Sequence, residues 1–133
     1  MEKELSKVFK ALGEPTRLRI IKMLSVQGMC VCELSETLNM LQPRVSQHLK
    51  VLKEAGLLQE QKEGYWVCYS LNREIIDQLW SDFQLFLAAD LRELNGYKEE
   101  YMRLKGLKAN ERIRKIKEAL GVSPFDIIRE SKL

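Results

Sequence analysis

The chain has 133 residues, with 22 Lys or Arg, 19 Asp or Glu, one histidine and three cysteines, and 45% of it is apolar. A chain of this length can bury its own core, which excludes a disulfide-held mini-protein and argues against a two-domain enzyme. No stretch approaches the roughly 18 apolar residues of a membrane span, so we expect a soluble cytoplasmic protein with no membrane partner. In a reducing compartment the three cysteines are expected to be thiols, ligands or core residues.

The net charge of +3 is distributed unevenly along the chain. Residues 1–27 carry +3, residues 40–62 carry +2 and residues 96–133 carry +4, whereas residues 73–95 carry −3. A protein that contacts phosphates on one side needs basic surface concentrated in particular elements. The distribution is therefore compatible with nucleic-acid binding.

Four helices are predicted in the first half of the chain. Apolar residues recur at helical spacing over residues 4–12, 15–26, 32–39 and 43–55. Pro15 suits the first turn of the second helix, where its missing N–H is not needed. The last two helices are joined by a tight turn, and the final one has an apolar inner side and a polar, basic outer side. This arrangement predicts a helix-turn-helix unit.

The period then changes from 3.6 to 2. Residues 57–62 and 65–71 predict the two strands of a hairpin. Residues 73–94 return to a helical period, with an apolar and aromatic stripe too large for the surface of a small monomer. We therefore expect the chain to pair with a second copy in a homodimer. The predicted interface residues are Leu5, Ile76, Leu79, Trp80, Phe83, Phe86 and Leu87.

A break near residue 95 divides the predicted organisation. Residues 1–95 are expected to form the DNA-binding and dimerisation domain, and residues 96–133 a helical C-terminal extension. Within the extension, residues 97–104 could prolong the preceding helix and residues 113–120 suggest a further one. Ser123, followed by Pro, predicts the start of a short final helix.

The second helix of the predicted helix-turn-helix unit has the side chains that major-groove reading requires. Residues near its N-terminal half would reach base edges and its lysines would reach phosphates, with the hairpin tip acting as a wing. The predicted DNA-contacting residues are Gln42, Arg44, Ser46, Gln47, His48, Lys50, Lys53, Lys62 and Tyr65. An ordinary solvated basic helix has the same spacing, so spacing alone leaves the two interpretations open.

Four stretches in this order closely resemble the ArsR/SmtB family of winged-helix repressors: Pro15–Ile21, Cys30–Leu34, Gln42–Leu58 and Gly64–Leu71. The resemblance covers roughly residues 4–92. It implies a mainly α, winged helix-turn-helix fold with a small β-hairpin. It also implies a homodimer that binds double-stranded operator DNA at an inverted repeat and leaves it when an inducer, often a metal or metalloid ion, binds.

Cys30 and Cys32 are candidate ligands for such an inducer. On a regular helix they would point about 200° apart, so both can bind one ion only if this segment is extended or is the frayed start of a helix. A helix N-terminus is expected to lower the pKa of these thiols. The Cys-Val-Cys sequence resembles the arsenite- and antimonite-responsive members of the family, which implies As(III) or Sb(III) as inducer. Those members usually have a third cysteine where this chain has Ser35.

Cys68 is the candidate third thiol. If residues 29–31 form a short strand beside the second wing strand, Cys68 would approach the other two, although strand alternation allows its side chain to point away. The three cysteines are therefore the predicted ion ligands, with Ser35 as the alternative to Cys68. Thiol oxidation competes with ion binding as the inducing signal, and a free cysteine can also be a small buried hydrophobe.

Other functions receive less support from the sequence. The chain lacks the common nucleotide, zinc-protease and serine-hydrolase motifs, so we predict no enzyme and no catalytic cofactor. Residues 73–94 contain no histidine, and His48 is the only one in the chain, which argues against a zinc site on the long helix. A metal-independent regulator, or an adaptor that binds protein through the aromatic stripe, remains an alternative.

Overall fold

The structure, a computed structural model, describes residues 1–121. The chain divides into two compact units, Met1–Leu87 and Ala88–Leu133. The predicted final helix at Ser123 lies outside the described residues. Among those described, no helix is long and apolar enough to cross a membrane.

The first unit opens with two helices, α1 (Glu2–Leu12) and α2 (Pro15–Val26), both within a few residues of the predicted bounds. The carboxylate of Glu14 caps α2 by accepting a hydrogen bond of 2.9 Å from the backbone N–H of Arg17. Because Pro15 is the first residue of α2, it removes an N–H that would have no partner inside the helix. Local capping therefore sets the corner between the two helices.

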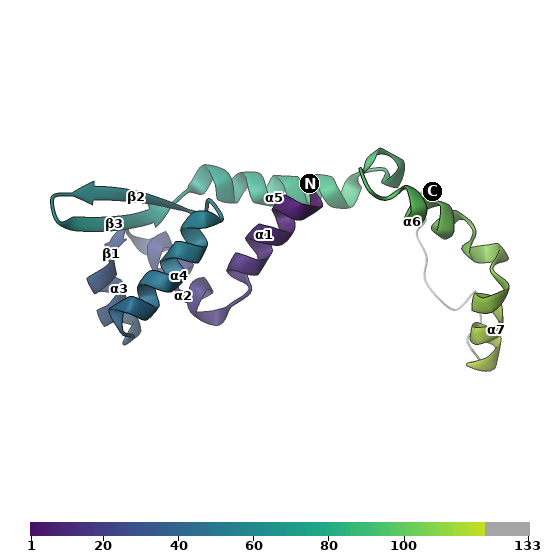
Figure 1. Cartoon of the computed structure of the whole chain (residues 1–133), viewed down its shortest axis with the longest axis horizontal. Helices are drawn as coiled ribbons and strands as arrows, with labels where there is room; N and C mark the ends of the chain where they lie inside the picture. Colours follow the sequence, from purple (N-terminus) through teal and green to yellow (C-terminus); the bar gives the residue numbers. More distant parts are fainter. Residues whose placement is uncertain (122–133) are drawn as a thin grey trace. The chain divides into compact units, whose positions relative to one another are not determined.

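The helix-turn-helix unit consists of α3 (Val31–Leu38) and α4 (Gln42–Glu54). Asn39 ends α3 in the left-handed region with φ 51°, which asparagine tolerates better than most residues. The hydroxyl of Ser35 donates a hydrogen bond to the backbone carbonyl of Met40 in the turn. These contacts define a short turn between the two helices (Figure 1).

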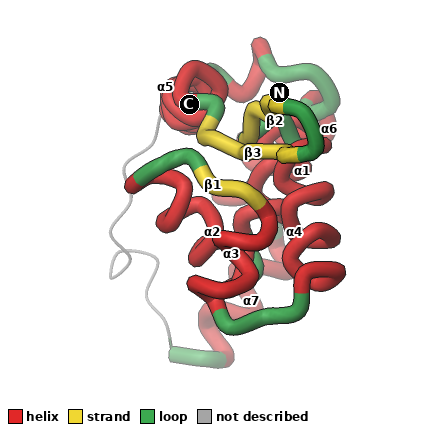
Figure 2. The backbone as a smooth tube through the Cα atoms, turned by 90° about the vertical axis from the view of Figure 1, so that its left-hand side faces the viewer, coloured by secondary structure: helices red, strands yellow, loops and turns green. Residues whose placement is uncertain are grey.

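Three strands form a small antiparallel sheet in the order β1, β3, β2 (Figure 2). They are β1 (Met29–Cys30), β2 (Leu58–Glu63) and β3 (Trp66–Leu71). The hairpin turns at Gly64, whose φ of +61° disfavours a side chain. The short strand β1 lies immediately before α3 and pairs with β3, as predicted, so the sheet joins the wing to the start of the helix-turn-helix unit.

The core lies where the helices meet the inner face of the sheet. Almost completely buried side chains of α2, α3, α4 and the segment before β2 form it: Ile20, Leu24, Leu34, Val45, Leu49, Leu52 and Leu57. Met29, Leu58, Tyr69 and Leu71 add the inner face of the sheet. Residues on the opposite face of β3 therefore point away from the core.

The long helix α5 (Arg73–Ala88) ends six residues earlier than predicted. The carboxylate of Asp90 accepts a hydrogen bond of 2.9 Å from the backbone N–H of Arg92 and starts a separate 3-10 turn at Leu91–Glu93. The same carboxylate pairs with the Arg92 guanidinium at 2.6 Å. A favourable local cap therefore replaces the continuation that periodicity alone predicted.

The second unit contains two further helices among its described residues, α6 (Lys98–Lys105) and α7 (Glu111–Ala119). The first is a separate helix and does not prolong α5, which answers the question left open by the sequence. Tyr101 lies under two cations, 5.9 Å from the guanidinium carbon of Arg92 and 5.4 Å from the ammonium of Lys105. A 3-10 turn at Leu107–Ala109 joins the two helices.

Candidate nucleic-acid interface and thiol site

The outer face of α4 is polar and exposed because its inner face is fully occupied by the core. Val45, Leu49 and Leu52 are each at most 1% exposed, which determines how the helix is rotated. The exposed residues predicted to reach DNA from α4 are Gln42, Arg44, Ser46, Gln47, Lys50 and Lys53. The core therefore presents these six side chains together on one surface.

The N-terminus of α4 has no side-chain cap. Leu41 occupies the capping position, and its backbone carbonyl accepts hydrogen bonds from the N–H groups of Arg44 and Val45. Within residues 1–121 no carboxylate pairs with Arg44 or Lys50. The positive end of the helix dipole and Arg44 make this end of α4 electropositive, and Lys50 adds a second cation further along the helix.

Lys53 and Lys62, the two other lysines predicted to contact phosphates, share one carboxylate. The ammonium of Lys53 donates a hydrogen bond of 2.7 Å to Glu60, and the ammonium of Lys62 lies 3.9 Å from the same side chain. The Tyr69 hydroxyl also donates to Glu60 at 3.2 Å. The hydrogen bond from Lys53 is the largest cause of a lowered pKa for Glu60. Part of the positive charge beside the wing is thus neutralised within the chain.

The tip of the wing is aromatic and open to solvent. Tyr65 is fully exposed, and the neighbouring Trp66 is 60% exposed. Lys62 and Gly64 on the same tip are exposed as well. The tip can therefore contact a surface without any rearrangement of the core.

His48 is the predicted DNA-contacting residue whose surroundings differ most from the expectation. Its side chain is only 16% exposed, and its Nδ1 lies 3.4 Å from the guanidinium of Arg17 and 3.9 Å from the carboxylate of Glu14. Arg17 in turn donates a hydrogen bond of 2.6 Å to the carbonyl of Ala11 at the end of α1. These contacts join three helices, and no sequence signal pointed to them because His48 lies 31 positions from Arg17.

Cys30 and Cys68 are brought together by strand pairing. The two residues stand directly opposite each other in the antiparallel pair of β1 and β3, so their side chains project from the same face of the sheet. Both side chains are partly exposed. The concern that strand alternation turns Cys68 away from the other thiols is therefore resolved for Cys30, which lies on the same face.

The expectation that the helix N-terminus lowers the thiol pKa is wrong for Cys30. Its pKa is raised to about 12, first because of the hydrogen bond with Cys68, then because of partial burial and the nearby Glu33 carboxylate. Glu33 also accepts a hydrogen bond of 2.8 Å from the backbone N–H of Cys30, in a reciprocal capping arrangement. The raised pKa keeps this thiol protonated at neutral pH.

Cys32 and Ser35 stand apart from the paired thiols. Among the described residues no three His, Cys, Asp or Glu side chains are arranged to hold a metal ion, so Cys32, in the first turn of α3, does not complete a site with Cys30 and Cys68. The hydroxyl of Ser35 is engaged by the carbonyl of Met40. Of the two candidates for a further ligand, Cys68 is placed beside Cys30 and Ser35 is not.

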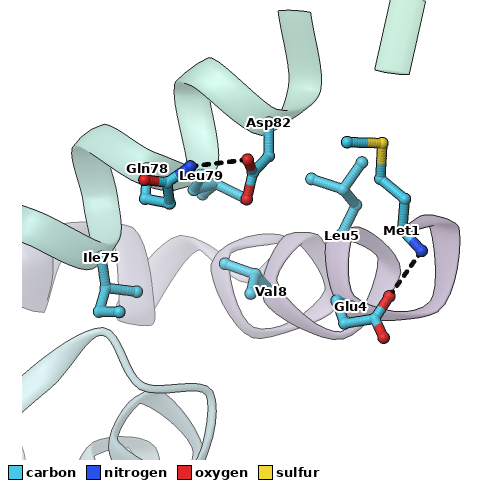
Figure 3. A pocket seen from close by; sticks show the side chains of 8 residues that line it. All are labelled: Met1, Glu4, Leu5, Val8, Ile75, Gln78, Leu79 and Asp82. Atoms are coloured by element: carbon cyan, nitrogen blue, oxygen red, sulfur yellow. Dashed lines mark hydrogen bonds and ion pairs between the residues drawn. The ribbon is translucent and has the colours of Figure 1, made fainter. Parts of the chain in front are cut away.

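A groove runs between α1 and α5 (Figure 3). Leu5 and Val8 from α1 face Ile75 and Leu79 from α5 across a space of about 370 Å³. Further along the two helices, Phe9 and Phe83 pack edge to face with ring centroids 5.1 Å apart. These contacts hold α1 against α5.

The seven predicted dimer residues differ in how much the single chain already covers them. Leu5 is 6% exposed, and Ile76, Leu79, Phe83 and Phe86 are partly buried. Trp80 and Leu87 are 64% and 60% exposed. The last two therefore carry most of the uncovered apolar surface in the predicted set.

A helix-turn-helix with an exposed polar second helix, followed by a β-hairpin, defines a winged-helix DNA-binding regulator. Residues 14–60 match the family of bacterial regulatory proteins described as the arsR family. The chain is 41% identical over 95 residues to the arsenical resistance operon repressor of Escherichia coli, an alignment that covers 65% of this chain and 81% of that protein. The chain belongs to the arsR family.

Two solved structures resemble the fold. A possible transcriptional regulator for arsenical resistance has a TM-score of 0.54 and 32% identity, covering 60% of this chain and 82% of that one. A homodimeric winged helix-turn-helix DNA-binding domain from Mycobacterium bovis has a TM-score of 0.55 and 26% identity, covering 65% and 80%. The winged-helix fold predicted from the sequence is confirmed.

Proposed function

We propose that this protein is a homodimeric repressor that binds an inverted-repeat operator through α4 and the wing. A thiophilic ion, As(III) or Sb(III), binds the thiols of Cys30, Cys32 and Cys68 and releases the repressor from DNA. The observation that carries the proposal is the pairing of Cys30 with Cys68 at the entrance to the helix-turn-helix unit. The similarity to the arsenical resistance operon repressor supports the choice of inducer.

The chemistry of the paired thiols suits a hydroxylated metalloid. Sulfur ligands prefer soft ions, and the neighbouring Cys68 raises the pKa of Cys30, so Cys30 keeps its proton at neutral pH. When arsenous acid, As(OH)₃, exchanges its hydroxides for thiols, each S–H proton leaves as water with a displaced hydroxide. No net proton is released, whereas a hydrated divalent cation must expel the thiol protons into solvent.

Release from DNA follows from the position of Cys32. It lies in the first turn of α3, outside the pair, so a three-sulfur site requires this turn to unwind and Cys32 to swing toward Cys30. The short turn after α3 carries this displacement into α4. An ion that binds only the displaced conformer shifts the population away from the DNA-binding form, and a coupling of about 1–3 kcal/mol suffices.

The test is operator binding by the reduced protein, with its own promoter as probe and arsenite, antimonite, Cd²⁺ and Zn²⁺ as effectors. Arsenite and antimonite are expected to lower the affinity at least fivefold, and Cys30→Ser with Cys32→Ser is expected to abolish that response. Cys68→Ser decides whether the third sulfur takes part. Ser70→Ala is the matched control, because Ser70 lies on the same strand and face as Cys68.

Two outcomes would reject different parts of the proposal. Tight, salt-sensitive operator binding that no ion changes would retain the repressor and reject the thiol inducer site. An affinity for the promoter that hardly changes with salt would reject the repressor itself, because phosphate contacts give a steep salt dependence.

A further inference from the structure

The pairing of β1 with β3 places two of the three cysteines where they could form a disulfide, a reaction separate from ion binding. Cys30 and Cys68 occupy directly opposed positions in the ladder. Opposed residues in antiparallel strands have Cα atoms about 4.5–5.5 Å apart, within the roughly 4.4–6.8 Å that a disulfide spans. The spacing of opposed positions therefore suits a disulfide between the two strands.

We propose that Cys30 and Cys68 are an oxidative modification site, at which hydrogen peroxide forms an intramolecular disulfide between β1 and β3. Because a disulfide cannot coordinate a soft ion, the oxidised repressor stays on its operator and no longer responds to arsenite. The loss of the ion response rests on the proposed function, whereas the disulfide itself does not.

The reaction balances with peroxide as the only oxidant. The thiol of one cysteine loses its proton, and the thiolate attacks an oxygen of hydrogen peroxide. The O–O bond breaks, a sulfenic acid forms, and the leaving hydroxide takes up the released proton to give water. The sulfur of the second cysteine then attacks the sulfenic sulfur, the S–O bond breaks, and a second water leaves with the proton of the second thiol. Two thiols and one peroxide thus give one disulfide and two waters.

Access and backbone geometry favour this pair over the alternatives. Both thiols are partly exposed and lie on the outer side of the sheet, opposite the face that carries the buried Met29. Cys32 belongs to the first turn of α3 and is not part of this pair. A bond from Cys32 to either partner would have to unwind that turn first, whereas Cys30 already has extended backbone at φ −81° and ψ 165°.

The structure also predicts why oxidation leaves DNA binding intact. A disulfide between opposed residues keeps the existing register of β1 and β3, and it leaves the capping contact of Glu33 with the backbone of Cys30 in place. The position of α3, and therefore of α4, is unchanged. Ion binding would thus release the operator, whereas oxidation of the same thiols would leave the operator bound and block that release.

The first arm of the test is disulfide mapping in the full-length protein. Peroxide treatment, alkylation and trypsin are expected to join residues 23–44 to residues 63–73, because trypsin cleaves after Lys22, Arg44, Lys62 and Arg73. The first peptide contains both Cys30 and Cys32, so Cys32→Ser is the matched control and should keep the crosslink. Cys30→Ser and Cys68→Ser should each lose it. A crosslink that persists in Cys30→Ser, or disulfides only between chains, would overturn the proposal.

The second arm measures arsenite binding and operator affinity on reduced and oxidised protein. Oxidised protein is expected to bind the operator within about twofold of reduced protein and to lose its bound arsenic; a larger loss of operator affinity would overturn the claim that oxidation spares DNA binding. If reduced protein binds no arsenic, the proposed inducer fails, and the mapping arm still decides the disulfide. If the crosslink is absent while reduced protein responds to arsenite, the inducer stands and the oxidation site is rejected.

Discussion

The helices α4 and α5 are both amphipathic, but only α4 has its apolar face buried within a single chain. α4 has three side chains that are at most 1% exposed, whereas α5, although longer, has no buried residue. The core of the first unit covers the apolar face of α4 and leaves its polar face free for a ligand. The apolar face of α5 remains partly uncovered, with Trp80 64% exposed.

This difference separates two roles that look alike in a hydrophobic pattern. A helix whose apolar face is filled inside the chain is held in one orientation and can present side chains accurately. A helix that leaves large aromatic side chains in solvent is suited to burial against another surface. In the proposed repressor, α5 with α1 forms the dimer and α4 reads the operator.

The largest expected effect comes from disrupting the exposed apolar face of α5. Trp80→Glu places a charge in the proposed dimer interface, so the protein should sediment as a monomer. Its operator affinity should fall roughly 100-fold or more, because the second half-site is no longer bound intramolecularly. Sedimentation velocity and fluorescence anisotropy measure the two effects. Ser81→Glu is the control, since it adds the same charge at an exposed position of α5 that the helical period places on the opposite side from the proposed interface; a Trp80→Glu dimer would contradict the assignment.

A substitution on the buried face of α4 is expected to lower the stability of the protein. Leu49→Ala removes a core side chain of α4 and should lower the free energy of unfolding by about 2–5 kcal/mol, measured by urea denaturation. The neighbouring Lys50→Ala should change it by no more than about 0.5 kcal/mol, while weakening operator binding. Equal unfolding midpoints for the two variants would show that the helix is not held by its inner face.

A smaller effect is expected at the contacts that join α4 to α1 and α2. Arg17→Ala removes the hydrogen bonds to the carbonyls of Ala11 and Lys10 and the contact with His48, which should cost about 1–3 kcal/mol. Thermal unfolding measures the loss, with Arg19→Ala as the exposed control from the same helix. The prediction fails if both variants melt together.

The smallest expected effect concerns the ion pair beside the wing. The hydrogen bond from Lys53 lowers the pKa of Glu60 below its ordinary value of 4.5. The stabilisation is therefore fully present above pH 4.5 and is lost as the pH falls through the lower pKa of the folded state. Thermal unfolding of Glu60→Gln across this range should show a weaker pH dependence than the wild type. Parallel curves for the two proteins would remove Glu60 from the acid response.

Periodicity predicted the elements that depend on local pattern. The spacing of Val45, Leu49 and Leu52 predicted both α4 and its buried side, because a helix with an apolar stripe turns that stripe to the core. The same reasoning extended α5 too far, since periodicity does not register a carboxylate such as Asp90 that starts a new turn by accepting a backbone hydrogen bond. The pKa of Cys30 was misjudged because Cys68, partial burial and Glu33 all raise it, and of these only Glu33 is close to Cys30 in the sequence.

The sequence by itself determined the helix-turn-helix, the hairpin and the family, because these depend on residue spacing and on motifs in a fixed order. Only the tertiary structure decided that Cys30 stands opposite Cys68, that His48 lies beside Arg17, and that α5 keeps an uncovered apolar face. Each of these depends on contacts between residues far apart in the chain, or on what the core fails to cover. Long-range contacts and uncovered surface arise only when the chain folds, so a local sequence pattern does not reveal them.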